Sequence, residues 1–96
     1  MARILVVDDE PDLLETVRRI LSRAGHEVVA VGSGAEAIRT LEARAPELVL
    51  TDLMMPGVDG LALVARVREL EPLTPVVLMT AFATLDTAVA ALRAGA

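Results

Sequence analysis

Acidic and hydroxyl side chains stand at the ends of three apolar runs in this sequence. Asp8 and Asp9 follow "RILVV", Asp52 follows "ELVLT", and Thr80 follows "PVVLM". If the three carboxylates lie together, each pair repels by roughly 4 kcal/mol at about 4 Å and an effective dielectric near 20. Such a cluster needs a cation or partial protonation. The hard ion Mg²⁺, which prefers oxygen ligands in octahedral geometry, is the natural partner.

Asp52 is the candidate nucleophile of this cluster. With Mg²⁺ bound, the outermost carboxylate can attack a phosphoryl group, because the metal offsets negative charge on both reactants. Thr80 could then hydrogen-bond a phosphoryl oxygen, and a backbone carbonyl near Met54 could complete the metal shell. The stretch "LMMPGVDG" after Asp52 is rich in Pro and Gly, which predicts a turn that folds over the site.

The same residues have a plainer interpretation. "DDEP" is also a common solvated helix entry, since acidic side chains are favourable near a helix N-terminus. Asp52 would then only turn the chain, Thr80 would only end a strand, and Met54 would only pack. The sole histidine, His26, has no second residue of its kind and is predicted to be a surface residue. The coincidence of acids and a hydroxyl at neighbouring strand ends favours the site over this alternative.

The elements that must position these residues follow from the hydrophobic pattern. Four apolar runs without alternation are typical of strands that are covered on both faces, at residues 3–8, 27–31, 47–52 and 75–80. Segments whose apolar residues recur at helical spacing lie between these runs and after the last one. Pro, Gly and a Ser33–Glu36 capping box mark the helix ends. The predicted helices run from Pro11 to Gly25, from Ser33 to before Pro46, from after the loop 51–60 to before Pro72, and over 84–95.

Four alternating strand and helix units predict an α/β fold with a parallel sheet between two layers of helices. Right-handed crossovers restrict the topology, and the flavodoxin-like arrangement places the strands in the order 2-1-3-4. In such three-layer folds ligands bind at the carboxyl ends of the strands, near the switch between strands one and three. Asp8, Asp9 and Asp52 fall at those ends.

Composition bounds the range of functions. Ninety-six residues suit one small domain. A net charge of −5 disfavours direct contact with nucleic acid, and the absence of Trp and Tyr removes base-stacking platforms. No apolar stretch is long enough to predict a membrane span, and the lack of Cys fits a cytoplasmic protein. All nine basic residues are Arg, so the sequence contains no Lys.

Four stretches together resemble the receiver domain of bacterial response regulators: "ILVVDDEPDLLETVRRIL", "DLMMPGVDG", "PVVLMTA" and "AVAALRAGA". The resemblance covers residues 1–96, and it implies the flavodoxin-like (CheY-like) fold. The stretch "MTAFATLDTAVAALRAGA" is particularly similar to receivers of enhancer-binding transcription activators.

The resemblance implies that Asp52 accepts a phosphoryl group from the phosphohistidine of a sensor histidine kinase in a two-component phosphorelay. It also implies that Asp8, Asp9, Asp52 and the Met54 backbone carbonyl hold Mg²⁺, and that Thr80 is the switch hydroxyl. The protein would then be a signalling module and not an enzyme. An aspartyl phosphatase of related fold would need a second acid two residues after the nucleophile, where Met54 stands.

The sequence departs from the family at its C-terminal end. Receivers carry a fifth strand and a fifth helix, and this sequence ends at the "RAGA" that normally precedes them. We therefore expect a receiver that is incomplete at the C-terminus and lacks the family lysine. Strand four would then form an open edge that can pair with a second copy, as a homodimer or an element-swapped dimer. The other possibility is that these residues are part of a longer regulator. The alternative function is a dimerisation or structural module without phosphorylation.

Overall fold

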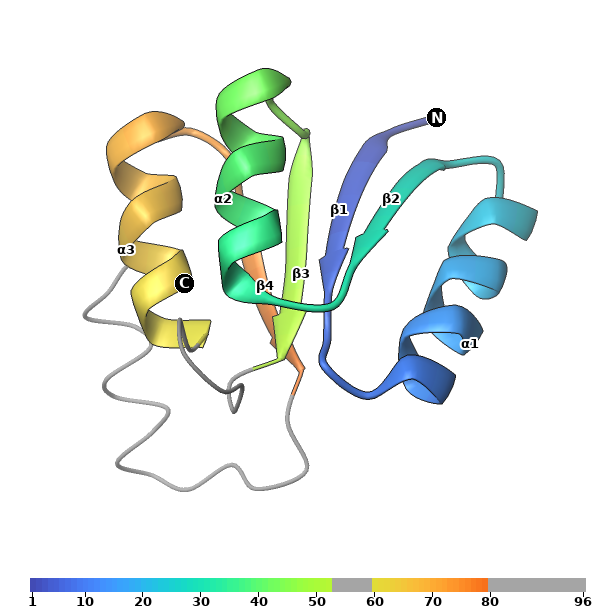
Figure 1. Ribbon diagram of the computed structural model, residues 1–96. Coiled ribbons are helices and arrows are strands. Elements are labelled where there is room, and N and C mark those ends of the chain that lie inside the picture. Colours follow the sequence, from blue (N-terminus) through green and yellow to red (C-terminus); the bar gives the residue numbers. More distant parts are fainter. Residues whose placement is uncertain (53–59, 80–96) are drawn as a thin grey trace.

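The fold was described from a computed structural model, which describes residues 1–52 and 60–79 (Figure 1). Within these residues, four strands alternate with three helices, as the hydrophobic pattern predicts for this part of the chain. The predicted helix over 84–95 lies outside the described residues. The elements are β1 (Arg3–Val7), α1 (Pro11–Arg23), β2 (Glu27–Val31), α2 (Gly34–Ala43), β3 (Leu48–Asp52), α3 (Gly60–Leu70) and β4 (Val76–Met79).

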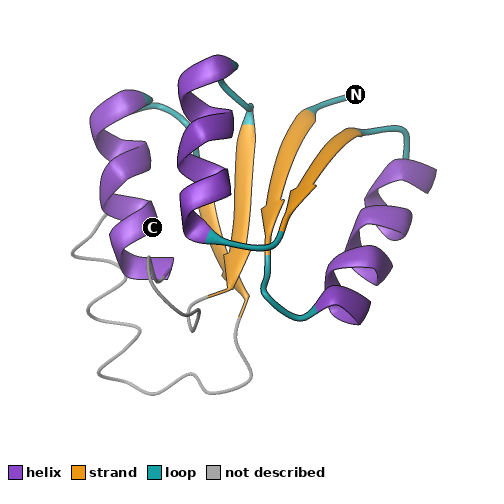
Figure 2. Cartoon of the chain, viewed as in Figure 1, coloured by secondary structure: helices purple, strands orange, loops and turns teal. Residues whose placement is uncertain are grey.

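The four strands form one parallel sheet in the order β2-β1-β3-β4, which confirms the predicted topology. Helices α2 and α3 cover one face of the sheet and α1 covers the other, so the fold has three layers (Figure 2). The register pairs Val7 of β1 with both Val31 of β2 and Thr51 of β3. The carboxyl ends of these three strands are therefore level with one another.

The main core lies between the sheet and the pair α2 and α3. Because it is built from Leu, Val and Ala, it excludes water through aliphatic packing alone, at about 1.5–3 kcal/mol for each fully buried large side chain. Ile38, Leu70, Val31 and Leu78 pack around its edge. The buried members of this core are Leu5, Val7, Ala37, Leu41, Val49, Leu63, Val64, Val67 and Val76.

The helix on the other face is much less covered. No side chain of α1 is fully buried, although its apolar residues recur at helical spacing. Leu13 is 46% exposed and Ile20 is 62% exposed. The physical reason is that α1 packs mainly on β2 and β1, so the sheet beneath it covers only part of its apolar stripe.

The start of α2 contains a variant of the predicted capping box. The Ser33 hydroxyl accepts a hydrogen bond from the Glu36 N–H at 3.2 Å, as predicted. The Glu36 carboxylate, however, accepts from the N–H of Gly32 at 3.0 Å and not from that of Ser33. The first contact satisfies an N–H group of the first helical turn, and the second ties the side chain of Glu36 to the residue before the N-cap.

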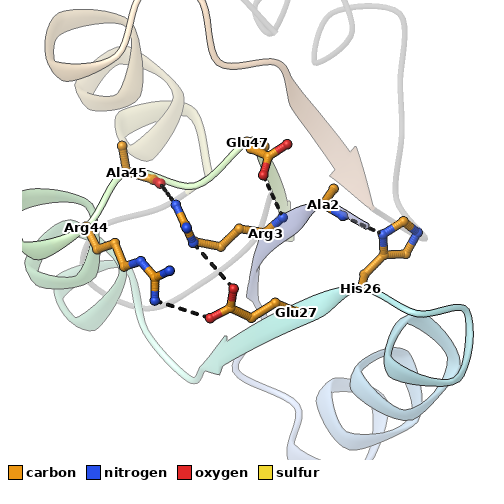
Figure 3. Close-up of polar contacts among 7 residues, drawn as sticks. All are labelled: Ala2, Arg3, His26, Glu27, Arg44, Ala45 and Glu47. Carbon is orange, nitrogen blue, oxygen red and sulfur yellow. Dashed lines mark hydrogen bonds and ion pairs between the residues drawn. The ribbon is translucent and has the colours of Figure 1, made fainter.

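A polar network ties the amino ends of the strands to the end of α2 (Figure 3). Arg3 is at its centre: its guanidinium donates to the Ala45 carbonyl at 3.0 Å and lies 3.6 Å from the Glu27 carboxylate. Glu27 also pairs with Arg44 at 3.2 Å. The backbone N–H of Arg3 donates to the Glu47 carboxylate at 3.3 Å. This end of the sheet therefore pairs each acid with a donor.

His26 belongs to the same end of the sheet (Figure 3), and its burial corrects the prediction that it is a surface residue. It is half-buried, and its Nδ1 accepts a hydrogen bond from the Ala2 N–H at 3.0 Å. The carbonyl of Ala2 in turn accepts from the Glu27 N–H at 2.9 Å. These contacts extend the pairing of β1 and β2 by one residue, which the sequence pattern could not reveal.

Candidate functional site

Three carboxylates meet at the carboxyl ends of β1 and β3. The pairing of Val7 with Thr51 places the next residues of the two strands, Asp8 and Asp52, beside each other. One carboxylate oxygen from each of Asp8, Asp9 and Asp52 lies within 4.8 Å of the others. The structure thus brings together the three acids that the sequence placed at neighbouring strand ends.

Asp8 is the buried member of this cluster, with 1% of its surface exposed. Its backbone N–H donates to the Val31 carbonyl at 3.2 Å and so continues the pairing of β1 with β2. Its Oδ1 accepts a hydrogen bond from the Glu10 N–H at 2.8 Å. Its Oδ2 is buried and has no hydrogen-bond partner among the described residues. A buried anionic oxygen without a partner is destabilising unless a cation or a donor reaches it.

Burial raises the pKa of the Asp8 carboxyl above its ordinary value, because desolvation disfavours the charged form. The hydrogen bond from the Glu10 N–H opposes this rise in pKa. The nearby carboxylates of Asp52 and Asp9 add to it through charge repulsion. A positive charge beside the three carboxylates would offset both the desolvation cost and the charge repulsion.

The cluster suits a hard divalent cation. Its donors are all carboxylate oxygens, and Asp8 carries a buried Oδ2 that has no hydrogen-bond partner among the described residues. Asp9 is exposed and Asp52 is half-buried, so the cluster is open to solvent on one side. Mg²⁺ typically binds one or two carboxylates and keeps several waters, which such an open cluster allows.

Two predicted site residues, Met54 and Thr80, lie outside the described residues. The register nevertheless shows which strand leads to Thr80. Met79, the last residue of β4, pairs with Asp52 of β3. The described part of the site therefore consists of the three acids and the ends of β1, β3 and β4.

One residue of this region was missed at the level of sequence. Thr51 precedes Asp52 and is fully buried. Its hydroxyl donates to the backbone carbonyl of Asp52 at 3.0 Å. The available signal was a hydroxyl in a strand whose other inward positions are aliphatic.

Comparison with known proteins decides the family. The family model described as "Response regulator receiver domain" matches residues 4–96. The chain belongs to this family. Receiver domains are signalling modules of two-component systems, and they are not classical enzymes. Within residues 1–52 and 60–79, no helix of this receiver is both long enough and apolar enough to cross a membrane.

Curated relatives of this receiver include transcriptional regulators. It is 39% identical over 93 residues to the DNA-binding transcriptional regulator NtrC of Escherichia coli (strain K12), and the aligned region covers 97% of this chain and 20% of that protein. It is 43% identical over 95 residues to the response regulator protein FleR of Pseudomonas aeruginosa, and the aligned region covers 99% of this chain and 20% of that protein. The chain thus spans about a fifth of the length of these relatives. The predicted similarity to receivers of NtrC-type enhancer-binding regulators is confirmed.

Solved structures share the fold of this receiver. The chemotaxis protein CheY4 of Vibrio cholerae superposes with a TM-score of 0.95 at 28% identity, over 100% of this chain and 82% of that one. NtrX of Brucella abortus superposes with a TM-score of 0.91 at 41% identity, over 99% of this chain and 22% of that one. The flavodoxin-like, CheY-like arrangement that the sequence predicts is therefore confirmed.

Proposed function

We propose that this receiver is the phosphoacceptor of a two-component phosphorelay, and that Asp52 takes a phosphoryl group from the phosphohistidine of a sensor histidine kinase. The observation that carries the proposal is the meeting of Asp8, Asp9 and Asp52 within 4.8 Å at the strand ends. Asp52 is half-buried at the open side of the cluster, whereas Asp8 is buried and out of reach of a large donor.

The proposed metal is Mg²⁺, held by Asp8, Asp9, Asp52 and the backbone carbonyl of Met54. The Oδ2 of Asp8 supports this assignment, because it is a buried carboxylate oxygen without a hydrogen-bond partner among the described residues. When bound, the ion supplies positive charge that offsets both the carboxylates and the incoming phosphoryl oxygens. Asp8 is held toward the cluster by the hydrogen bond from the Glu10 N–H to its Oδ1.

In the proposed reaction, a carboxylate oxygen of Asp52 attacks phosphorus. The bond between phosphorus and the donor imidazole nitrogen breaks, and its electron pair stays on that nitrogen. The product is an acyl phosphate on Asp52. Thr80 is the proposed hydroxyl that responds to the new phosphoryl oxygens.

Residues 1–96 are proposed to belong to one receiver domain that acts in the cytoplasm, where its donor kinase domain would lie. The partner is the sensor kinase, with no direct contact to nucleic acid or membrane by these residues. The net charge of −5 supports the absence of nucleic-acid contact. A homodimer through the outer edge of β4 stays a prediction.

The direct test is to incubate the purified chain with Mg²⁺ and acetyl phosphate and to measure its intact mass. We expect the mass of one phosphoryl group to be added to the wild type and to Asp12→Asn, which removes an exposed carboxylate outside the cluster. Asp52→Asn should stay unmodified. If a folded wild type gains no mass, the alternative of a structural module is favoured. If Asp52→Asn still gains mass, another residue is the acceptor.

A further inference from the structure

Thr51 occupies a place where an aliphatic residue would be expected. It is fully buried in β3, on the side of the sheet that faces α2 and α3. Its partners in the neighbouring strands are Val7 of β1 and Leu78 of β4. Val49, two residues earlier on the same side of β3, belongs to the aliphatic core. Valine has nearly the shape of threonine, so packing alone does not explain the hydroxyl.

Among the described residues, the hydroxyl of Thr51 makes one hydrogen bond, and its partner is the proposed phosphoacceptor. It donates to the backbone carbonyl of Asp52 over 3.0 Å. This carbonyl belongs to the peptide that leaves β3, so the hydrogen bond restricts the ψ angle of Asp52. Side-chain rotamers depend on the backbone angles of their own residue. The contact therefore acts on the direction in which the Asp52 carboxylate points.

We infer that Thr51 is a positioning residue for Asp52: its buried hydroxyl holds the carboxylate in line with those of Asp8 and Asp9. The inference rests on the proposed function and extends that function by naming a residue that sets the geometry of the nucleophile. Small misplacements of reacting groups reduce rates strongly, because the attacking atom must be aligned before reaction. The same alignment decides whether Asp52 can share a metal ion with its neighbours.

The first test compares Thr51→Val, which removes the hydroxyl, with Thr51→Ser, which keeps it. Thr74→Val is the matched control, because Thr74 is another buried threonine that donates to a backbone carbonyl, that of Pro46, at 3.4 Å. With acetyl phosphate and saturating Mg²⁺, Thr51→Val should react about tenfold more slowly than the wild type, as expected for the loss of one orienting hydrogen bond. Thr51→Ser and Thr74→Val should react at nearly the wild-type rate.

The second test asks whether the effect passes through Asp52. Isothermal titration calorimetry with MgCl₂ should give a dissociation constant about tenfold higher for Thr51→Val, as is typical when a group that orients a metal ligand is lost. In an Asp52→Ala background, Thr51→Val should change the dissociation constant no further, because the group that it positions is absent. Urea midpoints of all variants show whether each one is folded.

Several results would overturn the inference. It fails if folded Thr51→Val reacts and binds Mg²⁺ like the wild type, if Thr51→Ser loses as much as Thr51→Val, or if the effect on Mg²⁺ persists without Asp52. A wild type that binds Mg²⁺ but is never phosphorylated refutes the proposed function, while the calorimetry still decides the role of Thr51. A wild type that does neither refutes both.

Discussion

Replacing Asp8 by asparagine should stabilise this receiver at neutral pH when no divalent cation is present. Asp8 is 1% exposed, and the carboxylate oxygens of Asp9 and Asp52 lie within 4.8 Å of its own. At 4.8 Å, one pair of charges repels by roughly 1 kcal/mol in a water-like dielectric and by roughly 3.5 kcal/mol at an effective dielectric near 20. We therefore expect the free energy of unfolding to rise by about 1–3 kcal/mol.

Asparagine suits the site sterically. Its carbonyl oxygen can keep the hydrogen bond from the Glu10 N–H, which is 2.8 Å long in the wild type. Its amide nitrogen takes the place of the orphaned Oδ2 and can donate to a neighbouring carboxylate. Asp12→Asn is the control, because it removes the same charge from an exposed position in the first turn of α1. That change should slightly lower stability by removing an acid near the helix N-terminus.

The assay is urea unfolding followed by circular dichroism, with EDTA or with Mg²⁺, at several pH values. The folded-state pKa of Asp8 is raised, so the folded state holds this proton more tightly than the unfolded state. The destabilisation by Asp8 is thus absent at low pH, where both states are protonated, and it grows as pH rises through the ordinary and then the raised pKa. The advantage of Asp8→Asn should follow the same course.

Mg²⁺ should reverse the order of stability, so that the wild type becomes more stable than Asp8→Asn. At a hundredfold excess over its dissociation constant, a ligand stabilises the folded state by about 2.7 kcal/mol, and Asp8→Asn should lose much of this gain. The reasoning is wrong if Asp8→Asn is less stable than the wild type in EDTA. It is equally wrong if Asp12→Asn gives the same gain, since the effect would then come from net charge alone.

Three further predictions concern packing, the polar network and assembly. Leu63→Ala should lower the free energy of unfolding by about 2–5 kcal/mol, because Leu63 is fully buried. Ile20→Ala, at a position that is 62% exposed, should change the free energy of unfolding by less than about 1 kcal/mol. Equal losses for the two variants in urea unfolding would contradict the described core. Arg3→Met should lower stability by about 1–2 kcal/mol through loss of its contacts to Ala45 and Glu27, whereas the same change at the mostly exposed Arg44 should have little effect on the thermal midpoint. If the edge of β4 pairs two copies, sedimentation should give a dimer that Val77→Lys dissociates, and a wild-type monomer at high concentration would rule out this interface.

Much of the fold follows from local pattern and general topology. Apolar runs without alternation indicate strands buried on both faces, and the handedness of crossovers leaves few arrangements for four of them. The order β2-β1-β3-β4 was therefore predictable. The meeting of Asp8 with Asp52 was predictable for the same reason, because level strand ends bring the residues after β1 and β3 together.

What could not be predicted depends on contacts between distant segments. Helical spacing correctly placed α1, but it could not show that Ile20 lies beyond the part of the sheet that the helix covers. The partner of His26 is Ala2, 24 residues away, and no local pattern links them. The role of Thr51 is hidden because threonine is common in strands, and only its burial and its contact with Asp52 distinguish it.

The two ends of the sheet differ in whether arginine neutralises their acidic side chains. At the amino ends, Arg3 and Arg44 neutralise Glu27, so this sequence can place arginine beside an acid. At the carboxyl ends, Asp8 and Asp9 form no ion pair with an arginine within the described residues, although Asp8 is buried. An internal arginine would relieve the repulsion permanently and leave nothing for a ligand to change. Because the repulsion is retained, binding of a cation at these carboxylates would both stabilise the fold and prepare Asp52 for a negatively charged donor.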